Sequence, residues 1–482
     1  MVVSEDLRSS LFSVKQLSER IKTEDISPPD LVEVCLDRIK KLNSTINAFI
    51  TIIDEKELYK QAEIAKKEIK QGNYKGTLHG IPFSIKDIIK AKGIRCTAGS
   101  KILSNYISDR DATVVKKMKE AGAILIGTNN LNEFASGITG TNPFYGSSKN
   151  PWNISKISGG SSGGSSVAVA TGMVPISLGT DTGGSIRVPS SLCGVVGLKP
   201  TYGRVSKYGV LPLAPSFDHV GCITRSAWDT AAVLECISGW DISDESSVNK
   251  RIPAYTEIIE LLDKEISVGV PKSYFLDYLH SDVRGIFHNF LKMKLSNTNT
   301  VIDDNINLHN TEKYHRSWKD IRLAEASKIH AKWLQTRAKD YSKEVREMLV
   351  EGTKISATEY LDAANITKEI RNDFLSILKE KVDVIIVPTT IIPAPQIDEE
   401  TINIDGEVLL RTRDALLRNT IIFNSTGLPA VSIPIGLTKD NMPVGVQIIG
   451  APFKEHLILS LAYNFECIYN KGMDKFIPPL CC

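Results

Sequence analysis

The sequence predicts an α/β fold in which helices surround a central β-sheet within one large domain. The chain has 482 residues and is 42% hydrophobic, so it can bury a large core. Between about 78 and 225, short apolar runs alternate with glycine-rich turns and carry few charges, a pattern typical of buried strands. Similar runs return after residue 381, so a sheet that begins early in the chain is completed near its end.

The first expected elements are helices between Val14 and about Lys70. The stretch SPPDLVEVCLDRIKKL places apolar residues at helical spacing, and Ser27 followed by two prolines is a typical helix start. We expect residues 1–70 to form an N-terminal helical segment that packs on the core of a main domain at 71–482.

Strands are then expected at AILIG, VPISLG and VVGLK in the first half of the chain. The region from about 252 to 381 is lysine-rich and helical in pattern, with WKDIRLAEASKIHAKWL as its clearest amphipathic piece. Strand character returns in VDVIIVPTT, AVSIPI and MPVGVQIIG. We therefore expect the region at about 252–381 to be a helical insertion or cap rather than a separate C-terminal domain.

The composition argues against polyanion binding and membrane insertion. Lys and Arg number 58 against 56 Asp and Glu, so the net charge of +2 gives no field that attracts nucleic acid or an anionic membrane. The N-terminus lacks the pattern of a signal peptide, and no apolar run has membrane-spanning length. We expect a cytoplasmic protein that by itself binds neither nucleic acid nor membrane. The eight scattered cysteines show no CxxC pair or companion histidines at zinc spacing, so we expect reduced thiols and no metal site.

The nine-residue stretch SGGSSGGSS, residues 158–166, has three interpretations: a linker, a phosphate cradle or the floor of an active site. A phosphate loop of the type GxxxxGK[ST] would need a lysine that is absent, and GxGxxG does not occur. The GxSxG pattern of a nucleophile elbow is present but follows a polar loop, whereas the elbow requires an apolar strand before it. Its surroundings must therefore decide between the remaining interpretations.

The second glycine-serine stretch, GTDTGGSIRVPSS, has what an acyl-transfer site needs. Ser185 is a candidate nucleophile, and the side-chain-free Gly183 and Gly184 let the backbone N–H groups of residues 182–185 approach a substrate oxygen. We expect these groups to form an oxyanion hole. They belong to Thr182, Gly183, Gly184 and Ser185.

The base that would activate this serine is sought among lysines and histidines. His79 and His219 have the appearance of structural residues. Lys86 ends the apolar run of LHGIPFSIKD, where desolvation disfavours the ammonium form and makes a base near neutral pH. The alternative is a lysine at a strand end that buries its stem and keeps its ammonium in water.

Taken together, LHGIPFSIKD, PWNISKISGGSSGGSS, GTDTGGSIRVPSS, GLPAVSIPIG and MPVGVQIIG resemble the amidase signature family. The resemblance is strong from about 78 to 213, weak through the middle, and strong again from about 382 onward. It implies a mixed, twisted sheet surrounded by helices. It also implies a Ser-Ser-Lys triad of Lys86, Ser161 and Ser185, with a cis peptide before the bridging Ser161.

The chemistry implied by the resemblance is hydrolysis of a small carboxylic amide to acid and ammonia or amine, through an acyl-enzyme and without a cofactor or metal. Asp181 and Arg187 are expected to hold the nucleophile loop. The helical middle and side chains at about 138–145 are expected to line the acyl pocket. Apolar residues near its end suggest either an apolar acyl group or packing of a helix on the sheet: Leu416, Leu417, Ile421, Ile422 and Phe423.

Within this family, two groups remain open: stand-alone amidases, which are often homodimers, and the A subunit of glutamyl-tRNA(Gln) amidotransferase, which works with partner subunits. In the second group an arginine, matched here by Arg371, binds the glutamine carboxylate. An acidic residue ten positions before Gly427, the glycine of the GLP motif, binds the glutamine ammonium. That position is Leu417, and Asp414 would replace it only if the segments differ by a gap. Because an apolar side chain cannot pair with an ammonium, we favour a stand-alone amidase. A catalytically inactive binding subunit on the same fold is the hypothesis from another class.

Overall fold

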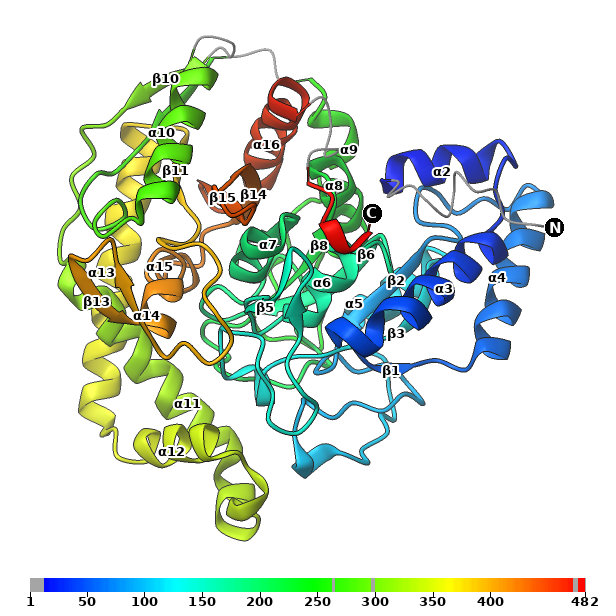
Figure 1. Ribbon diagram of the computed structural model, residues 1–482, viewed down its shortest axis with the longest axis horizontal. Coiled ribbons are helices and arrows are strands. Elements are labelled where there is room, and N and C mark those ends of the chain that lie inside the picture. The colour runs from blue at the N-terminus through cyan, green and yellow to red at the C-terminus, as the bar shows by residue number, and fades with distance from the viewer. Residues whose placement is uncertain (1–12, 262–264, 296–299, 471–475, 482) are drawn as a thin grey trace.

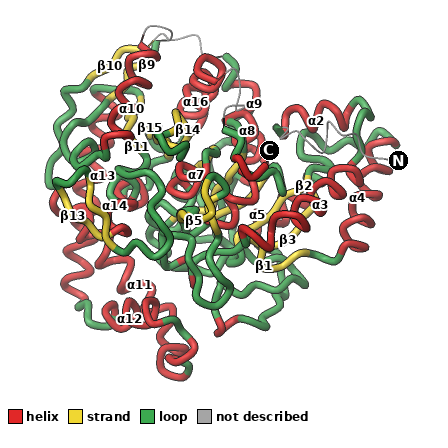
Figure 2. The backbone as a smooth tube through the Cα atoms, in the orientation of Figure 1, coloured by secondary structure: helices red, strands yellow, loops and turns green. Residues whose placement is uncertain are grey.

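The protein is a single large α/β domain built on one mixed, twisted sheet of 11 strands, as the sequence predicted (Figure 1; in Figure 2 the strands run through the interior). The computed structural model describes residues 13–261, 265–295, 300–470 and 476–481. The expectations for residues 1–12 and Cys482 lie outside the described residues.

The strand order across the sheet is β1-β3-β2-β6-β8-β7-β14-β15-β11-β9-β10. The bounds of these strands are β1 Phe49–Ile52, β2 Pro82–Lys86, β3 Ile124–Asn129, β6 Ile176–Asp181, β7 Val196–Lys199, β8 His219–Thr224, β9 Ile266–Gly269, β10 Thr300–Asp303, β11 Val384–Pro388, β14 Ala430–Leu437 and β15 Pro443–Gly450. Two small hairpins lie outside it, β4 Lys149–Asn150 with β5 Asn153–Ile157 and β12 Thr401–Ile404 with β13 Val408–Arg411.

Two neighbouring parallel strands end where the expected site residues lie. Strand β2 pairs in parallel with β6, with Phe83 opposite Ile176 and Ile85 opposite Leu178. Carboxyl ends of parallel neighbours meet at one edge of a sheet, where α/β proteins place their sites. Lys86, the last residue of β2, and Asp181, the last of β6, therefore point toward the same region.

The N-terminal segment packs beside strands β1, β2 and β3 (Figure 1). Its described residues form the helices α2 Val14–Lys22, α3 Pro28–Ile46 and α4 Glu55–Lys70. As expected, Ser27 is the N-cap of α3 and prolines occupy its first turn. The helical pattern did not predict β1. This strand of the N-terminal segment forms one edge of the main sheet.

The remaining helices surround the sheet and follow its strands in sequence (Figures 1 and 2). Their bounds are α5 Thr113–Glu120, α6 Gly163–Ala170, α7 Arg187–Cys193, α8 Ala227–Ile237, α9 Tyr255–Ile258, α10 Ser281–Leu295, α11 Tyr314–Thr336, α12 Lys343–Gly352, α13 Ala357–Glu380, α14 Thr412–Leu417, α15 Ile421–Ser425 and α16 Glu455–Asn470. Within the described ranges, no helix is both long and apolar enough to cross a membrane. Six described cysteines are free: Cys35, Cys96, Cys193, Cys222, Cys236 and Cys467.

The expectation of a purely helical insertion at about 252–381 needs correction. Helices α9 to α13 lie in this region, but so do β9 and β10, which pair in parallel and join the main sheet through β11. Both strands have only four residues, and β10 at the sheet edge is half exposed. Such short strands carry too little alternation to stand out from a lysine-rich helical background.

An aromatic cluster attaches this middle region to the sheet. The Phe374 ring on α13 lies 5.7 Å from that of Phe423 on α15 and 6.4 Å from that of Tyr314 on α11, measured between ring centroids. Phe275 stacks on Phe423 at 5.6 Å. Because Phe374 is fully buried, its packing fixes α11 and α15 relative to each other.

We expect Phe374→Ala to lower the free energy of unfolding by about 3–5 kcal/mol, because it removes a buried ring and leaves a cavity among three helices. Chemical denaturation followed by circular dichroism measures this difference. The exposed neighbour Asn372→Ala is the control and should change it by less than about 0.5 kcal/mol. Equal effects of the two variants would contradict the anchoring role of the cluster.

Candidate active site

Lys86 is fully buried at the end of β2. Its Nζ donates hydrogen bonds to Ser161 Oγ and to Thr180 Oγ1, both at 2.7 Å. Burial lowers the pKa of Lys86 from 10.5 to about 7, although the carboxylates of Asp181 and Asp218 favour the charged form. The lysine is therefore close to half neutral at physiological pH and held on a serine hydroxyl, not snorkelling into water.

The stretch SGGSSGGSS lies in the interior, and its glycines permit that placement. Residues 158–166 are all buried, and the Gly160–Ser161 peptide bond is cis, as the resemblance implied. A Cβ at Gly160 would collide with the Asn132 side chain and lie 2.7 Å from the Gly140 nitrogen. The stretch is not a flexible linker, because backbone segments here pack without room for side chains.

The two glycine-serine stretches lie against each other. Ser162 N–H donates to the Ser185 carbonyl at 3.1 Å, and the Ser162 side chain donates to the Thr180 carbonyl at 3.1 Å. These contacts place Ser161 beside the loop that follows β6. The structure therefore places Lys86 in contact with Ser161, and places Ser162, the next residue, in contact with the backbone of Ser185.

The carboxylate of Asp181 organises the loop that carries Ser185. It accepts hydrogen bonds from Gly184 N–H at 2.7 Å and from Ile186 N–H at 3.1 Å. This corrects the expected oxyanion hole, because the N–H of Gly184 points to Asp181 rather than to a substrate. The N–H groups of Thr182, Gly183 and Ser185 have no hydrogen-bond partner among the described residues.

Arg187 neutralises Asp181 and is itself fully buried. Its Nε and one Nη each lie 3.0 Å from an Asp181 oxygen, a bidentate pair. The remaining N–H groups reach Gln447 at 2.9 Å and Asn424 at 2.6 Å. Burial alone would raise the pKa of Asp181, but the Arg187 guanidinium outweighs burial and holds that pKa below its usual range. The hydrogen bonds and the ion pair expected of Asp181 and Arg187 at this loop are present.

A small cavity of about 20 Å³ borders Ser185. The loop 135–138 forms one wall, and Trp318 and Arg322 of α11 form another, together with Leu417 and Arg413 of α14. Trp318 Nε1 donates to the Thr182 carbonyl at 3.0 Å, which attaches α11 to the nucleophile loop. Of the expected lining, the helical middle contributes Trp318 and Arg322, whereas the stretch 138–145 contributes Ile138 and none of residues 139–145.

The expected substrate-binding residues separate in the structure. Leu417 lines the cavity, whereas Arg371 on α13 is not among its lining residues and donates instead to the Thr426 carbonyl. Asp414 is also outside it and pairs with Arg411 at 2.8 Å and His315 at 3.5 Å. Four of the five apolar residues that suggested an apolar acyl group do not line the cavity. They pack in the hydrophobic core, which is the alternative interpretation: Leu416, Ile421, Ile422 and Phe423.

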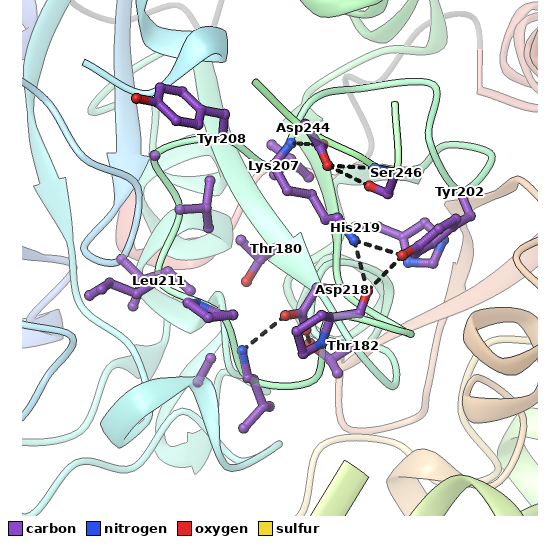
Figure 3. A pocket seen from close by; sticks show the side chains of 18 of the residues that line it. Thr180, Thr182, Tyr202, Lys207, Tyr208, Leu211, Asp218, His219, Asp244 and Ser246 are labelled. Atoms are coloured by element: carbon purple, nitrogen blue, oxygen red, sulfur yellow. Dashed lines mark hydrogen bonds between the residues drawn. The ribbon is translucent and has the colours of Figure 1, made fainter. Parts of the chain in front are cut away.

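A larger cavity of about 500 Å³ adjoins the first, since Ala135, Thr182 and Leu213 line both. Figure 3 shows Thr180, Asp218 and His219 on its wall, with Thr182 Oγ1 donating to Asp218 at 2.6 Å. Burial lowers the pKa of His219 well below its usual value, and the neighbouring Lys199 adds to this effect. His219 is therefore a neutral wall residue, consistent with its structural interpretation.

Sequence reasoning missed three contributors to the site. Thr180 hydrogen-bonds Lys86, and Trp318 and Arg322 line the cavity although they lie far from Ser185 in the sequence. Trp318 and Arg322 are one turn apart on α11 within the amphipathic segment noted above. Their helical spacing is equally typical of residues that pack a helix on a core, so it could not identify them as site residues.

The chain is similar to known proteins along nearly its whole length. The Amidase family model matches residues 30–459. The A subunit of glutamyl-tRNA(Gln) amidotransferase from Geobacter sp. (strain M21) is 36% identical over 479 residues, covering 94% of this chain and 96% of the relative. The crystal structure of the corresponding protein from Thermotoga maritima has a TM-score of 0.80 and 33% identity, covering 100% of this chain and 99% of that one. A crystal structure of an amidase has a TM-score of 0.85 and 32% identity, covering 95% of this chain and 100% of that one.

If neutral Lys86 is the base, kcat/KM should fall about tenfold per pH unit below about pH 7 and level off above it, because the fraction of neutral amine rises as pH rises through its pKa. Initial rates with a simple amide between about pH 5 and pH 9 measure this profile. Lys86→Met is the control and should be inactive throughout. A wild-type rate that stays constant between about pH 6 and pH 8 would contradict this role of Lys86.

Replacing Arg187 by Met should destabilise the protein by about 3–5 kcal/mol, because the buried Asp181 carboxylate loses its cation. Urea unfolding measures the loss. Arg110→Met removes a guanidinium that is 51% exposed and should leave the stability close to that of the wild type. A wild-type stability for the Arg187 variant would show that the pair does not hold the loop.

Proposed function

The chain belongs to the amidase family, and from this premise we propose that it hydrolyses a small-molecule carboxylic amide to an acid and ammonia or an amine. The observation that carries the proposal is the buried contact of 2.7 Å between Lys86 Nζ and Ser161 Oγ, next to the loop of Ser185. A lysine with a pKa near 7 is a competent base, and Ser185 keeps 5% of its surface exposed toward a cavity.

In the proposed acylation step, Ser185 Oγ attacks the amide carbon. Its proton passes to Ser161 Oγ while the proton of Ser161 passes to neutral Lys86, so a C–O bond forms and the carbonyl becomes an oxyanion. The protons then return through Ser161 to the amide nitrogen, the C–N bond breaks, and ammonia or amine leaves the acyl-enzyme. Water repeats the sequence on the ester and releases the acid.

The oxyanion is stabilised in this proposal by the free N–H groups of Thr182, Gly183 and Ser185 rather than by all four groups of the loop. Asp181 contributes indirectly, since its hydrogen bonds to Gly184 and Ile186 hold the loop in one conformation. Donors that are already oriented stabilise charge without reorganisation during the reaction. No cofactor or metal takes part in these steps.

A second candidate is the glutaminase role of an amidotransferase A subunit, with partner subunits that accept the ammonia. The identity of 36% to such an A subunit favours it. The site favours a stand-alone amidase instead, because Leu417 lines the cavity where an ammonium would need an acid, and Arg371 lies elsewhere. We retain the stand-alone amidase as the proposed function, active on its own whether monomeric or homodimeric.

The purified chain alone should release ammonia from simple amides, and Ser185→Ala should lower kcat by at least about 10⁴-fold because the nucleophile is lost. Labelling by a fluorophosphonate, followed by peptide mass analysis, should mark Ser185 in the wild type. Ser206→Ala, a buried serine outside both cavities, is the control and should keep both activity and labelling.

Hydrolysis of glutamine alone, or only after partner amidotransferase subunits are added, would favour the second candidate. Absence of both labelling and turnover with every amide would favour an inactive binding subunit on the same fold.

A further inference from the structure

The cavity beside Ser185 carries two guanidinium groups that the proposed chemistry does not use. Arg322 of α11 is 4% exposed, and Arg413 of α14 has a side chain that is 30% exposed. The described lining residues of this cavity include no aspartate or glutamate. The pocket of a candidate nucleophile is thus positively charged on one side, and its remaining lining is mainly apolar or backbone.

Arg322 is poorly satisfied for a buried cation. Its Nη1 donates to Met348 Sδ at 3.0 Å, a weak acceptor, and its plane lies 5.0 Å from the Trp318 ring centroid. Its Nε is buried and has no hydrogen-bond partner, and no carboxylate of the described residues lies within ion-pair distance of it. Burial lowers the pKa of Arg322 well below its usual value and Arg413 adds to this effect, while Glu351 and Glu344 partly offset it from beyond ion-pair distance.

Another buried arginine shows how the same chain satisfies a purely structural guanidinium. Arg187 has a bidentate carboxylate and side-chain oxygens of Gln447 and Asn424 around its N–H groups. Arg322 has none of these. Among the described residues, Glu344, whose side chain is 71% exposed, is the one carboxylate within ion-pair distance of Arg413, at 3.6 Å. A buried cation with unused donors at the edge of a cavity is suited to an anionic ligand.

We propose that Arg322, assisted by Arg413, binds a carboxylate of the substrate, so that the enzyme acts on short amides that also carry a free carboxylate. This inference rests on the proposed function, because it names the substrate class of that same site. A carboxylate is planar, which suits the forked guanidinium donors, and the adjoining cavity of about 500 Å³ leaves room for the rest of a short substrate.

The same charges disfavour substrates with an ammonium in this cavity. A cation placed near Arg322 and Arg413 would be repelled, and Leu417 offers it no compensating charge. The monoamide of a dicarboxylic acid therefore fits better than a zwitterionic amino-acid amide such as glutamine. Thus the positive wall also gives a physical reason for selectivity against glutamine.

The test compares succinamate with succinamide, a neutral isostere in which a second carboxamide replaces the carboxylate. For the wild type, kcat/KM for succinamate should exceed that for succinamide by about 100-fold, the effect expected for a desolvated charge pair. Arg322→Met should reduce this ratio to within about tenfold of unity. Arg316→Met, on the same helix with 82% of its side chain exposed, is the matched control and should retain the wild-type ratio.

Binding is measured separately from turnover, so that the two proposals can fail independently. Succinate is titrated into the Ser185→Ala protein by calorimetry, with and without Arg322→Met. Loss of binding in the double variant supports the carboxylate site even if the wild type hydrolyses nothing, an outcome that would overturn only the proposed function. If Arg322→Met does not fold by circular dichroism, Arg413→Met, which alters a partly exposed residue, replaces it and should lower the ratio by at least about fivefold.

Equal hydrolysis of succinamate and succinamide by the wild type would overturn the inference while leaving the proposed amidase intact. The same holds for succinate binding that Arg322→Met does not weaken.

Discussion

The buried ion pair between Asp181 and Arg187 is the interaction on which the active-site architecture depends. It joins the end of β6 to the start of α7 and extends through Arg187 to Asn424 of α15 and Gln447 of β15. Burying two charges is costly, so such a pair persists only when geometry and additional hydrogen bonds compensate for desolvation. Here the compensation comes from loop amides and side-chain oxygens, and the same contacts fix the conformation of the loop around Ser185.

Burial disfavours the charged form of both groups at this site, but the neighbours of the two groups differ. Asp181 stays ionised because a guanidinium contacts both of its oxygens. Lys86 has only hydroxyl and carbonyl partners within hydrogen-bond distance, so desolvation brings its pKa to about 7. A buried titratable group whose charged form lacks a counter-charge in contact with it is typical of acid–base sites.

Chemistry and selection come from different parts of the chain. Strands β2 and β6 and the glycine-serine stretch carry the groups proposed to break the bond, whereas α11 and α14 carry the side chains proposed to choose the substrate. The two parts meet at Trp318, whose indole N–H holds the nucleophile loop and whose ring stacks on Arg322. This arrangement allows substrate preference to change through helix substitutions that leave the lysine and both serines in place.

The fold class and the candidate catalytic residues were predictable from the sequence, because both rest on local patterns. The α/β class follows from apolar runs and turns, and Lys86, Ser161 and Ser185 stand in motifs dense enough to identify the family. Short strands such as β1, β9 and β10 escaped prediction because four residues carry little periodicity and their pairing partners lie far away in sequence.

Only the tertiary structure determines which polar atoms remain available to a ligand. No local pattern could reveal that Gly184 N–H is occupied by Asp181, that Arg371 lies outside the cavity, or that Arg322 lines it. Each of these outcomes depends on contacts between segments that are distant in sequence or on the exact course of a loop. Hydrogen-bond satisfaction and desolvation are properties of a three-dimensional neighbourhood, and they determine the charge of a binding cavity.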